Sequence, residues 1–384
     1  MDSDTLAAMR RLIPVLLLTM GCGSGTTAVD ATGDDDDDGT ENSNPSTAVP
    51  IDCPDDSPNI DYAGSGLPEL QSNPGAPLAL FLDFDGGTYH SHSSDDYTQY
   101  SGYNRNGSSD DFDAEEQADI IASWTHVSHY FAMFDVNVTT IDEVREESVG
   151  WGWILITEEE SGGRGSLGDS AIGTEPHARS YAGSSTARIE DGDKSRRLAH
   201  ELGHNFQLEH SGVWEGNDFY KWEDWDDWDE VYGPIMGGGG YGERNGWSYG
   251  NHEGDRDTMQ DTMEIIRQRV IDVAGSETGW RIDDFSDSDP TAMCDGDDHA
   301  YRRGILGSPD DEDLFKFYWA GGDLRVKATA PDVSAALLEV DVLQDGDVVG
   351  SLGKNEGLPA GDYQFLVRST GEYAAIGSYE ITAR

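Results

Sequence analysis

Two histidines and a glutamate stand together in the stretch His200-Glu201-Leu202-Gly203-His204. A spacing of four residues places both imidazoles on one face of a helix, where their ring nitrogens can reach a single zinc ion. Glu201 then lies beside the metal, where its carboxylate can take a proton from an attacking water and pass it to a leaving amine. The pattern predicts metal-assisted hydrolysis with Glu201 as the general base.

A third imidazole follows at His210, six residues after His204 and beyond the expected end of the helix. A turned chain can bring this ring back to the other two and leave one coordination position open, as a catalytic zinc site requires. We therefore expect one catalytic Zn²⁺ on His200, His204 and His210. The alternative third ligand is a downstream carboxylate such as Glu223 or Glu230.

The stretch from His200 to His210 resembles the zinc motif of the metzincin metalloproteases, H-E-x-x-H-x-x-G-x-x-H. Gln207 stands where the family has glycine. A non-glycine residue with positive φ costs about 1–2 kcal/mol, so we expect the exit from the helix to be built differently here. The resemblance also implies a methionine turn beneath the metal. Met236 stands 26 residues after His210, in Tyr232-Gly233-Pro234-Ile235-Met236-Gly237, and fits that turn. It would pack beneath the metal site and would not be a ligand.

Further segments between about residues 78 and 275 are similar to bacterial reprolysin-like metzincins: Leu82-Asp83-Phe84-Asp85-Gly86, Phe134 to Thr140, and Trp247-Ser248. The resemblance implies an upper half of sheet and helices, then the active-site helix, then a lower half that closes on a long helix. The segments Leu358 to Tyr363 and Gly377-Ser378-Tyr379 are similar to the pre-peptidase C-terminal β-sandwich of secreted proteases.

Hydrophobic periodicity predicts the elements that would position this site. We expect helices over residues 113–134, 194–206 and 256–273, the first with a capping box formed by Asp113 and Glu116. We expect strands over residues 78–84, 136–140 and 151–157, with an irregular edge strand near residues 180–182. Short alternating runs after residue 283 predict a β-sandwich.

The expected fold class is α+β. It comprises a metzincin-like catalytic domain, with a twisted mixed sheet, long helices, an active-site helix and a methionine turn, followed by a small all-β sandwich domain. Four segments of the 384 residues correspond to this plan: 1–22 as an export signal, 23–76 as a low-complexity acidic linker or propeptide remnant, 77–280 as the zinc metalloprotease domain, and 281–384 as the sandwich.

The N-terminus carries Met9-Arg10-Arg11 and a short apolar run, the pattern of an export signal. The run is shorter than the about 20 residues that cross a bilayer, so we expect no transmembrane helix. Leu18-Thr19-Met20-Gly21-Cys22 resembles a bacterial lipoprotein cleavage box, although Met20 departs from its usual small residue. A lipid anchor at Cys22 would give a cell-surface protein, such as an outer-membrane lipoprotein. Ordinary secretion is the alternative.

Apart from Cys22, the chain has only Cys53 and Cys294. Two cysteines in an oxidising compartment predict a disulfide between them. The rival interpretation makes Cys53 a latency thiolate on zinc, as in some metzincin propeptides.

The chain has 24 Lys and Arg against 76 Asp and Glu, a formal net charge of −52. Such a charge repels nucleic acid and anionic lipid surfaces, so we expect neither as a partner. It attracts divalent cations, and structural Ca²⁺ at residues 287–298 or 341–347 is one interpretation, with solvated turns as the other. The acidic, Trp-rich insert 222–230 has two interpretations. It either forms a wall of the substrate cleft, or its Trp side chains pack against the domain while its acidic side chains stay solvated or bind calcium.

Together these observations predict a secreted or surface-tethered zinc endopeptidase that acts on proteins or peptides. We expect it to be a monomer. The sequence offers no oxyanion partner two residues after Met236, where Gly238 stands. The alternative is a catalytically inert surface lipoprotein that binds glycan or protein through its sandwich.

Overall fold

A computed structural model of the chain describes Cys53 and residues 60–90, 97–107, 111–157, 163–164, 172, 178–183, 192–221, 232–237, 244–296, 299–331 and 333–384. The export signal, the Cys22 lipid box and the 222–230 insert lie outside these residues. None of the described helices is long and apolar enough to cross a membrane.

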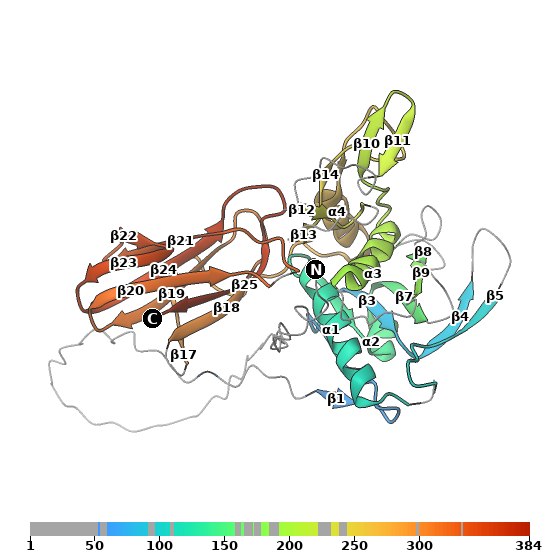
Figure 1. The fold of residues 1–384 in the computed structure, drawn as a ribbon, viewed down its shortest axis with the longest axis horizontal. Helices are drawn as coiled ribbons and strands as arrows, with labels where there is room; N and C mark the ends of the chain where they lie inside the picture. Colours follow the sequence, from blue (N-terminus) through green and yellow to red (C-terminus); the bar gives the residue numbers. More distant parts are fainter. Residues whose placement is uncertain are drawn as a thin grey trace, which may run out of the picture.

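One parallel sheet forms the centre of the first half of the molecule (Figure 1). Its strand order is β6-β3-β7-β9-β8, and only the edge pair β8–β9 is antiparallel. The inner strand β3 is buried along its whole length, as its continuous apolar run predicts. The segment near residues 180–182 is an inner strand and not the edge that we expected. The strands are β3 Leu78–Asp83, β6 Val136–Thr139, β7 Gly150–Thr157, β8 Gly163–Arg164 and β9 Ala178–Gly183.

Four helices accompany this sheet. The capping box at Asp113 and Glu116 is present at the start of α1, and the Trp124 indole N–H donates to the Val138 carbonyl at 2.9 Å, which fastens α1 to β6. Helix α4 begins six residues later than expected because Asp261 caps it by accepting from the Glu264 N–H. The helices are α1 Ala114–Tyr130, α2 Asp142–Glu147, α3 Gly192–Asn205 and α4 Thr262–Ala274.

The expected fold class is wrong. Strands make up 43% of the described residues and helices only 18%, so the chain is a mostly β protein built from several small sheets and a sandwich-like C-terminus, not a helix-rich metzincin catalytic domain. The physical reason lies in the segments between the helices. There, glycines and turn residues alternate with aromatic and β-branched residues, and pairs of very short strands form where no hydrophobic period is long enough to predict them. These pairs are β1 Asp61–Tyr62 with β2 Pro68–Glu69, β4 Gly86–His90 with β5 Tyr97–Ser101, β10 Gly212–Glu215 with β11 Asp218–Lys221, β12 Tyr232–Pro234 with β13 Arg244–Gly246, and β14 Tyr249–Gly250 with β15 Gln260–Asp261.

The C-terminal part forms two five-stranded sheets around buried aromatic and aliphatic side chains such as Phe315, Phe365 and Ile381. Alternating burial along β19 and β24 is the pattern of strands with one face in a core. One sheet has the order β16 Thr291–Ala292, β19 Glu312–Trp319, β24 Gly361–Ser369, β21 Leu338–Gln344 and β22 Asp347–Ser351. The other has the order β17 Cys294–Asp295, β18 Ala300–Leu306, β25 Gly377–Ala383, β20 Gly322–Thr329 and β23 Gly353–Leu358.

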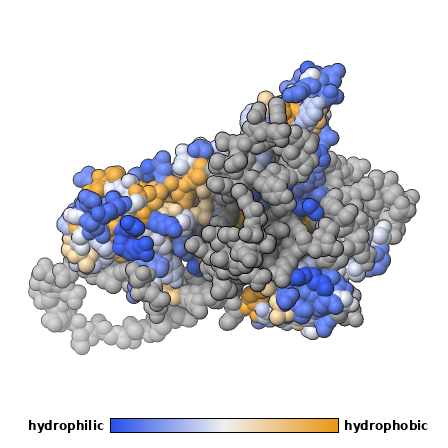
Figure 2. All heavy atoms as spheres, in the orientation of Figure 1, coloured by the Kyte–Doolittle hydropathy of each residue, from blue (hydrophilic) through white to orange (hydrophobic). Residues whose placement is uncertain are grey.

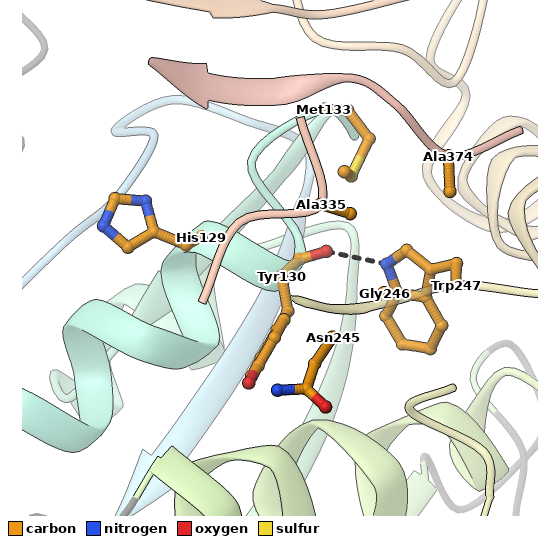
Figure 3. A pocket seen from close by; sticks show the side chains of 8 residues that line it. All are labelled: His129, Tyr130, Met133, Asn245, Gly246, Trp247, Ala335 and Ala374. Carbon is orange, nitrogen blue, oxygen red and sulfur yellow. Dashed lines mark hydrogen bonds between the residues drawn. The ribbon is translucent and has the colours of Figure 1, made fainter. Parts of the chain in front are cut away.

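The two halves are in contact. The Tyr373 hydroxyl of the sandwich donates to the Asp261 carboxylate at 2.5 Å and accepts from the Met263 N–H at 3.1 Å. A cavity of about 10 Å³, large enough for one water, lies between the end of α1, β13 and the loops at Ala335 and Ala374 (Figure 3). On the face drawn in Figure 2, the β10–β11 hairpin is mostly hydrophilic, whereas the sandwich shows hydrophobic residues beside hydrophilic ones.

The disulfide prediction is confirmed, since Cys53 is bonded to Cys294 across 241 residues of sequence. The Arg302 guanidinium donates to both sulfurs, at 3.1 and 3.0 Å. Cys53 is therefore not a thiolate available to zinc, and the latency interpretation is wrong for this state of the chain.

Candidate metal centre

Helix α3 presents the first two histidines. Its opposite side is anchored by Leu198, Ala199 and Leu202, which are buried in the core. With that side fixed, His200 and His204 fall one turn apart on the remaining face, and their ring centroids are 4.8 Å apart.

His210 returns to the same point after a sharp exit from the helix. Gln207 adopts φ 70°, the left-handed conformation that favours glycine, so the expectation that this exit is built differently is wrong. The Leu208 N–H then donates back to the Gly203 carbonyl at 3.2 Å. As a result the His210 ring centroid lies 5.2 Å from that of His200 and 4.8 Å from that of His204. One ring nitrogen from each histidine lies within 4.8 Å of the others, so the three residues could hold one metal ion. Glu223 and Glu230, the alternative third ligands, lie outside the described residues.

Each of the three imidazoles is oriented through its Nδ1 atom. His200 Nδ1 lies 2.8 Å from the Ile235 carbonyl oxygen, His204 Nδ1 lies 2.7 Å from the Leu208 carbonyl oxygen, and His210 Nδ1 lies 2.6 Å from Glu253 Oε2. Because a carbonyl and a carboxylate can only accept, Nδ1 carries a proton in each ring, and Nε2 is the ring nitrogen left to ligate a metal. Such hydrogen bonds fix the tautomer and the ring direction of metal-ligating histidines.

Burial also keeps two of the rings neutral. It lowers the pKa of His200 well below 6.5, and repulsion from His204 adds to this effect. Burial, with repulsion from His210, lowers the pKa of His204 to about 4. Neutral imidazole is the form that binds a metal, so these two rings are ready to ligate at neutral pH.

The sulfur of Met236 packs directly beneath α3. A Cβ atom at Gly203 would lie 2.5 Å from Met236 Sδ, so a side chain at this position would displace the methionine. The turn itself is closed by the Gly237 N–H, which donates to the Pro234 carbonyl at 3.0 Å. Arg196 Nη1 also donates to the Pro234 carbonyl, at 3.2 Å, and ties α3 to the same turn. Met236 therefore supports the histidines from below.

The predicted general base lies next to the first ligand. Glu201 is buried, with 6% of its surface exposed, in the same turn of α3 as His200. The fold thus brings the three predicted ligands, His200, His204 and His210, to one place, and the predicted base, Glu201, lies in the same turn of α3 as His200.

Two residues of the site were not predicted. Glu253 follows β14 and reaches His210 across 43 residues of sequence, and Lys221 at the end of β11 places its Nζ 3.4 Å from His210 Nε2. Hydrogen bonding to His210 lowers the pKa of Glu253, so its carboxylate stays charged. Neither residue stands at a sequence spacing from the histidines that would predict a contact. Each reaches the site only through the pairing of short strands.

No family model matches this chain, and no curated protein matches it. Among solved structures, it is similar to the periplasmic g-type lysozyme inhibitor PliG from Salmonella Typhimurium, with 15% identity and a TM-score of 0.18 over 22% of this chain and 89% of that one. It is also similar to OgpA from Akkermansia muciniphila, with 11% identity and a TM-score of 0.21 over 87% of this chain and 96% of that one. Similarities at these TM-scores carry no argument about fold or function. The resemblance to metzincins stays a prediction from the sequence motifs.

Proposed function

We propose that this chain is a secreted or surface-tethered zinc endopeptidase that hydrolyses peptide bonds in proteins. The observation that carries the proposal is the common orientation of three histidines. Each donates Nδ1–H to a fixed oxygen, and their rings converge with Nε2 as the remaining ligand atom. Three imidazole nitrogens suit zinc and leave a coordination position for substrate.

His200, His204 and His210 would hold the metal. When bound, zinc supplies a Lewis acid that polarises the scissile carbonyl and acidifies the attacking water. Glu201 accepts the proton of that water and returns it to the leaving amine nitrogen. Lys221 contributes positive charge beside His210, where it can stabilise negative charge that develops on the carbonyl oxygen.

An extracytoplasmic location agrees with the rest of the chain. The Cys53–Cys294 disulfide suits an oxidising compartment, and the export signal supplies a route to it. The mature protein is tethered to the membrane if Cys22 is acylated. Mass spectrometry of the mature N-terminus would detect this lipid.

The decisive experiment compares Glu201→Gln with the wild type. Elemental analysis should find one zinc per chain in both proteins, because Gln leaves the three histidines intact. Cleavage of denatured casein should be sensitive to a chelator and should fall by roughly 10²–10⁴-fold in the variant. Glu215→Gln, at an exposed acid of the β10–β11 hairpin, is the matched control and should cleave normally.

A second variant separates metal loss from loss of the base. His204→Ala should lose both zinc and activity. If the wild type holds zinc but cleaves no protein under any condition, the endopeptidase proposal fails and the alternative of an inert surface protein that binds through its sandwich takes its place.

A further inference from the structure

A second group of potential metal ligands lies where the chain enters the sandwich. Asp283 belongs to the segment that leads from α4 to the sandwich, whereas Asp311 and Asp313 stand at the start of β19. One carboxylate oxygen from each lies within 4.8 Å of the others. Their exposure falls in order, since Asp283 is exposed, Asp311 is half-buried and Asp313 is buried. The group therefore runs from solvent into the protein.

Asp313 is buried without full hydrogen bonding. None of its surface is exposed, and its Oδ2 atom accepts a hydrogen bond from the Tyr379 hydroxyl. Its Oδ1 atom is buried and has no hydrogen-bond partner among the described residues. A buried carboxylate oxygen in that state is costly unless a cation or a proton satisfies it.

The surroundings of Asp313 increase this cost. Burial raises its pKa to about 9, and repulsion from Asp284 and Asp311 adds to the effect. The neighbouring carboxylates are held in place by backbone groups: the Gly307 N–H donates to Asp311 Oδ2 at 2.6 Å, and the Phe285 N–H donates to Asp283 Oδ1 at 2.9 Å. The oxygens are thus fixed close together, where charge on all three carboxyl groups at once is unfavourable.

We propose that Asp283, Asp311 and Asp313 bind a calcium ion that joins the segment after α4 to the sandwich. Carboxylate oxygens are the ligands of hard cations, and calcium accepts an irregular set of oxygens, completed by carbonyls or water, more readily than magnesium does. The ion would satisfy Asp313 Oδ1 and neutralise the repulsion. The site lies outside residues 287–298 and 341–347, the two acidic runs that the sequence offered as calcium sites. In the second run, Asp341 is already paired with Arg368.

The position of this site gives the ion a structural effect. The segment before Asp283 is fastened to the first half by the Arg281 N–H, which donates to the Met133 carbonyl at 2.9 Å. The segment after it is fastened to β19 by the Leu314 N–H, which donates to the Ser286 carbonyl at 3.3 Å. Calcium bound between these points would stabilise the junction of the two halves. This proposal does not depend on the proposed peptidase activity.

The test uses the full chain, depleted of calcium with EGTA and titrated with calcium chloride by calorimetry and thermal unfolding. Wild type should bind one calcium ion saturably and unfold at a higher temperature with calcium present. Asp313→Asn keeps the side-chain shape and can still accept from Tyr379, so this variant should fold, should lose the calcium-dependent increase, and should be no less stable than wild type without calcium. Asp347→Asn, at an exposed acid of β22, should keep the wild-type response.

Two further measurements keep the test decisive. Terbium substituted for calcium should show luminescence sensitised by the phenol of Tyr379, and Asp283→Asn, at the exposed end of the site, should raise the calcium concentration needed for half-saturation at least 10-fold. His204→Ala should respond to calcium like wild type, which separates this site from the zinc centre. The proposal is overturned if wild type binds no calcium at 10 mM, or if Asp313→Asn keeps the full response.

Discussion

Glu253 accepts a hydrogen bond from His210 at 2.6 Å, whereas the other two histidines donate to backbone carbonyls. His210, the proposed third ligand, is thus the one whose orientation depends on a side chain. Replacing Glu253 with Ala should lower zinc affinity about 10–100-fold, the usual effect of losing such a partner. Gln can still accept the hydrogen bond, so Glu253→Gln should lose less. A competition titration against a chelator measures both. Wild-type affinity in the Ala variant would show that Glu253 does not orient the ligand.

The left-handed conformation at Gln207 predicts a stabilising substitution. Glycine adopts φ 70° without the steric cost that a side chain imposes, so Gln207→Gly should raise the free energy of unfolding by about 1 kcal/mol. Gln207→Ala removes the side chain but keeps the Cβ atom, and the difference between the two variants isolates the backbone effect. Urea unfolding measures it. Equal stabilities for the Gly and Ala variants would contradict the prediction.

Local signals in the sequence predicted local structure well. The capping box at Asp113 and Glu116, the buried strand β3 and the shared helix face of His200 and His204 all depend on residues close together in the chain. Each could be predicted because its hydrogen bonds or its burial follow from a short periodic pattern.

What the sequence could not predict depends on contacts between distant segments. Lys221 and Glu253 reach His210 only because β11 and β14 belong to two-stranded sheets of two to four residues, too short for any hydrophobic period. The same limit explains the wrong fold class, since most of the unforeseen strands are of this kind. The aspartate cluster shows it again: Asp313 is a potential ligand because Tyr379, 66 residues away, occupies only one of its two oxygens.

Lys221 should affect zinc binding and turnover in opposite directions. Its ammonium lies 3.4 Å from His210 Nε2, so it repels a cation bound there but stabilises negative charge on a substrate oxygen. In Lys221→Met, we expect zinc to bind more tightly and kcat to fall on the order of 10–100-fold, with a smaller change in KM. Lys221→Arg keeps the charge and should recover part of kcat. A purely structural role would weaken zinc binding and turnover together, so parallel losses would contradict this assignment.

His129 makes stability depend on pH at the contact between the two halves. Its Nδ1 lies 3.0 Å from Ser378 Oγ of β25, and burial, with repulsion from His126, lowers its pKa from 6.5 to about 3. Below pH 6.5 the unfolded chain gains a proton here that the folded chain does not, so stability falls as the pH falls from 6.5 towards 3. The loss approaches about 1.4 kcal/mol per pH unit, or roughly 2–3 kcal/mol between pH 6.5 and 4.5.

His129→Gln keeps a polar group near Ser378 but cannot titrate. Although the variant is expected to be less stable than wild type at pH 7, it should lose roughly 2–3 kcal/mol less than wild type between pH 6.5 and 4.5, because every other titrating group is shared. Urea unfolding at both pH values measures this difference. His299→Gln, at a half-buried position in the sandwich, is the matched control and should follow the wild-type curve. If the His129 variant loses stability as steeply as wild type, then His129 is protonated in the folded chain, and the contact between α1 and β25 must accommodate a charge.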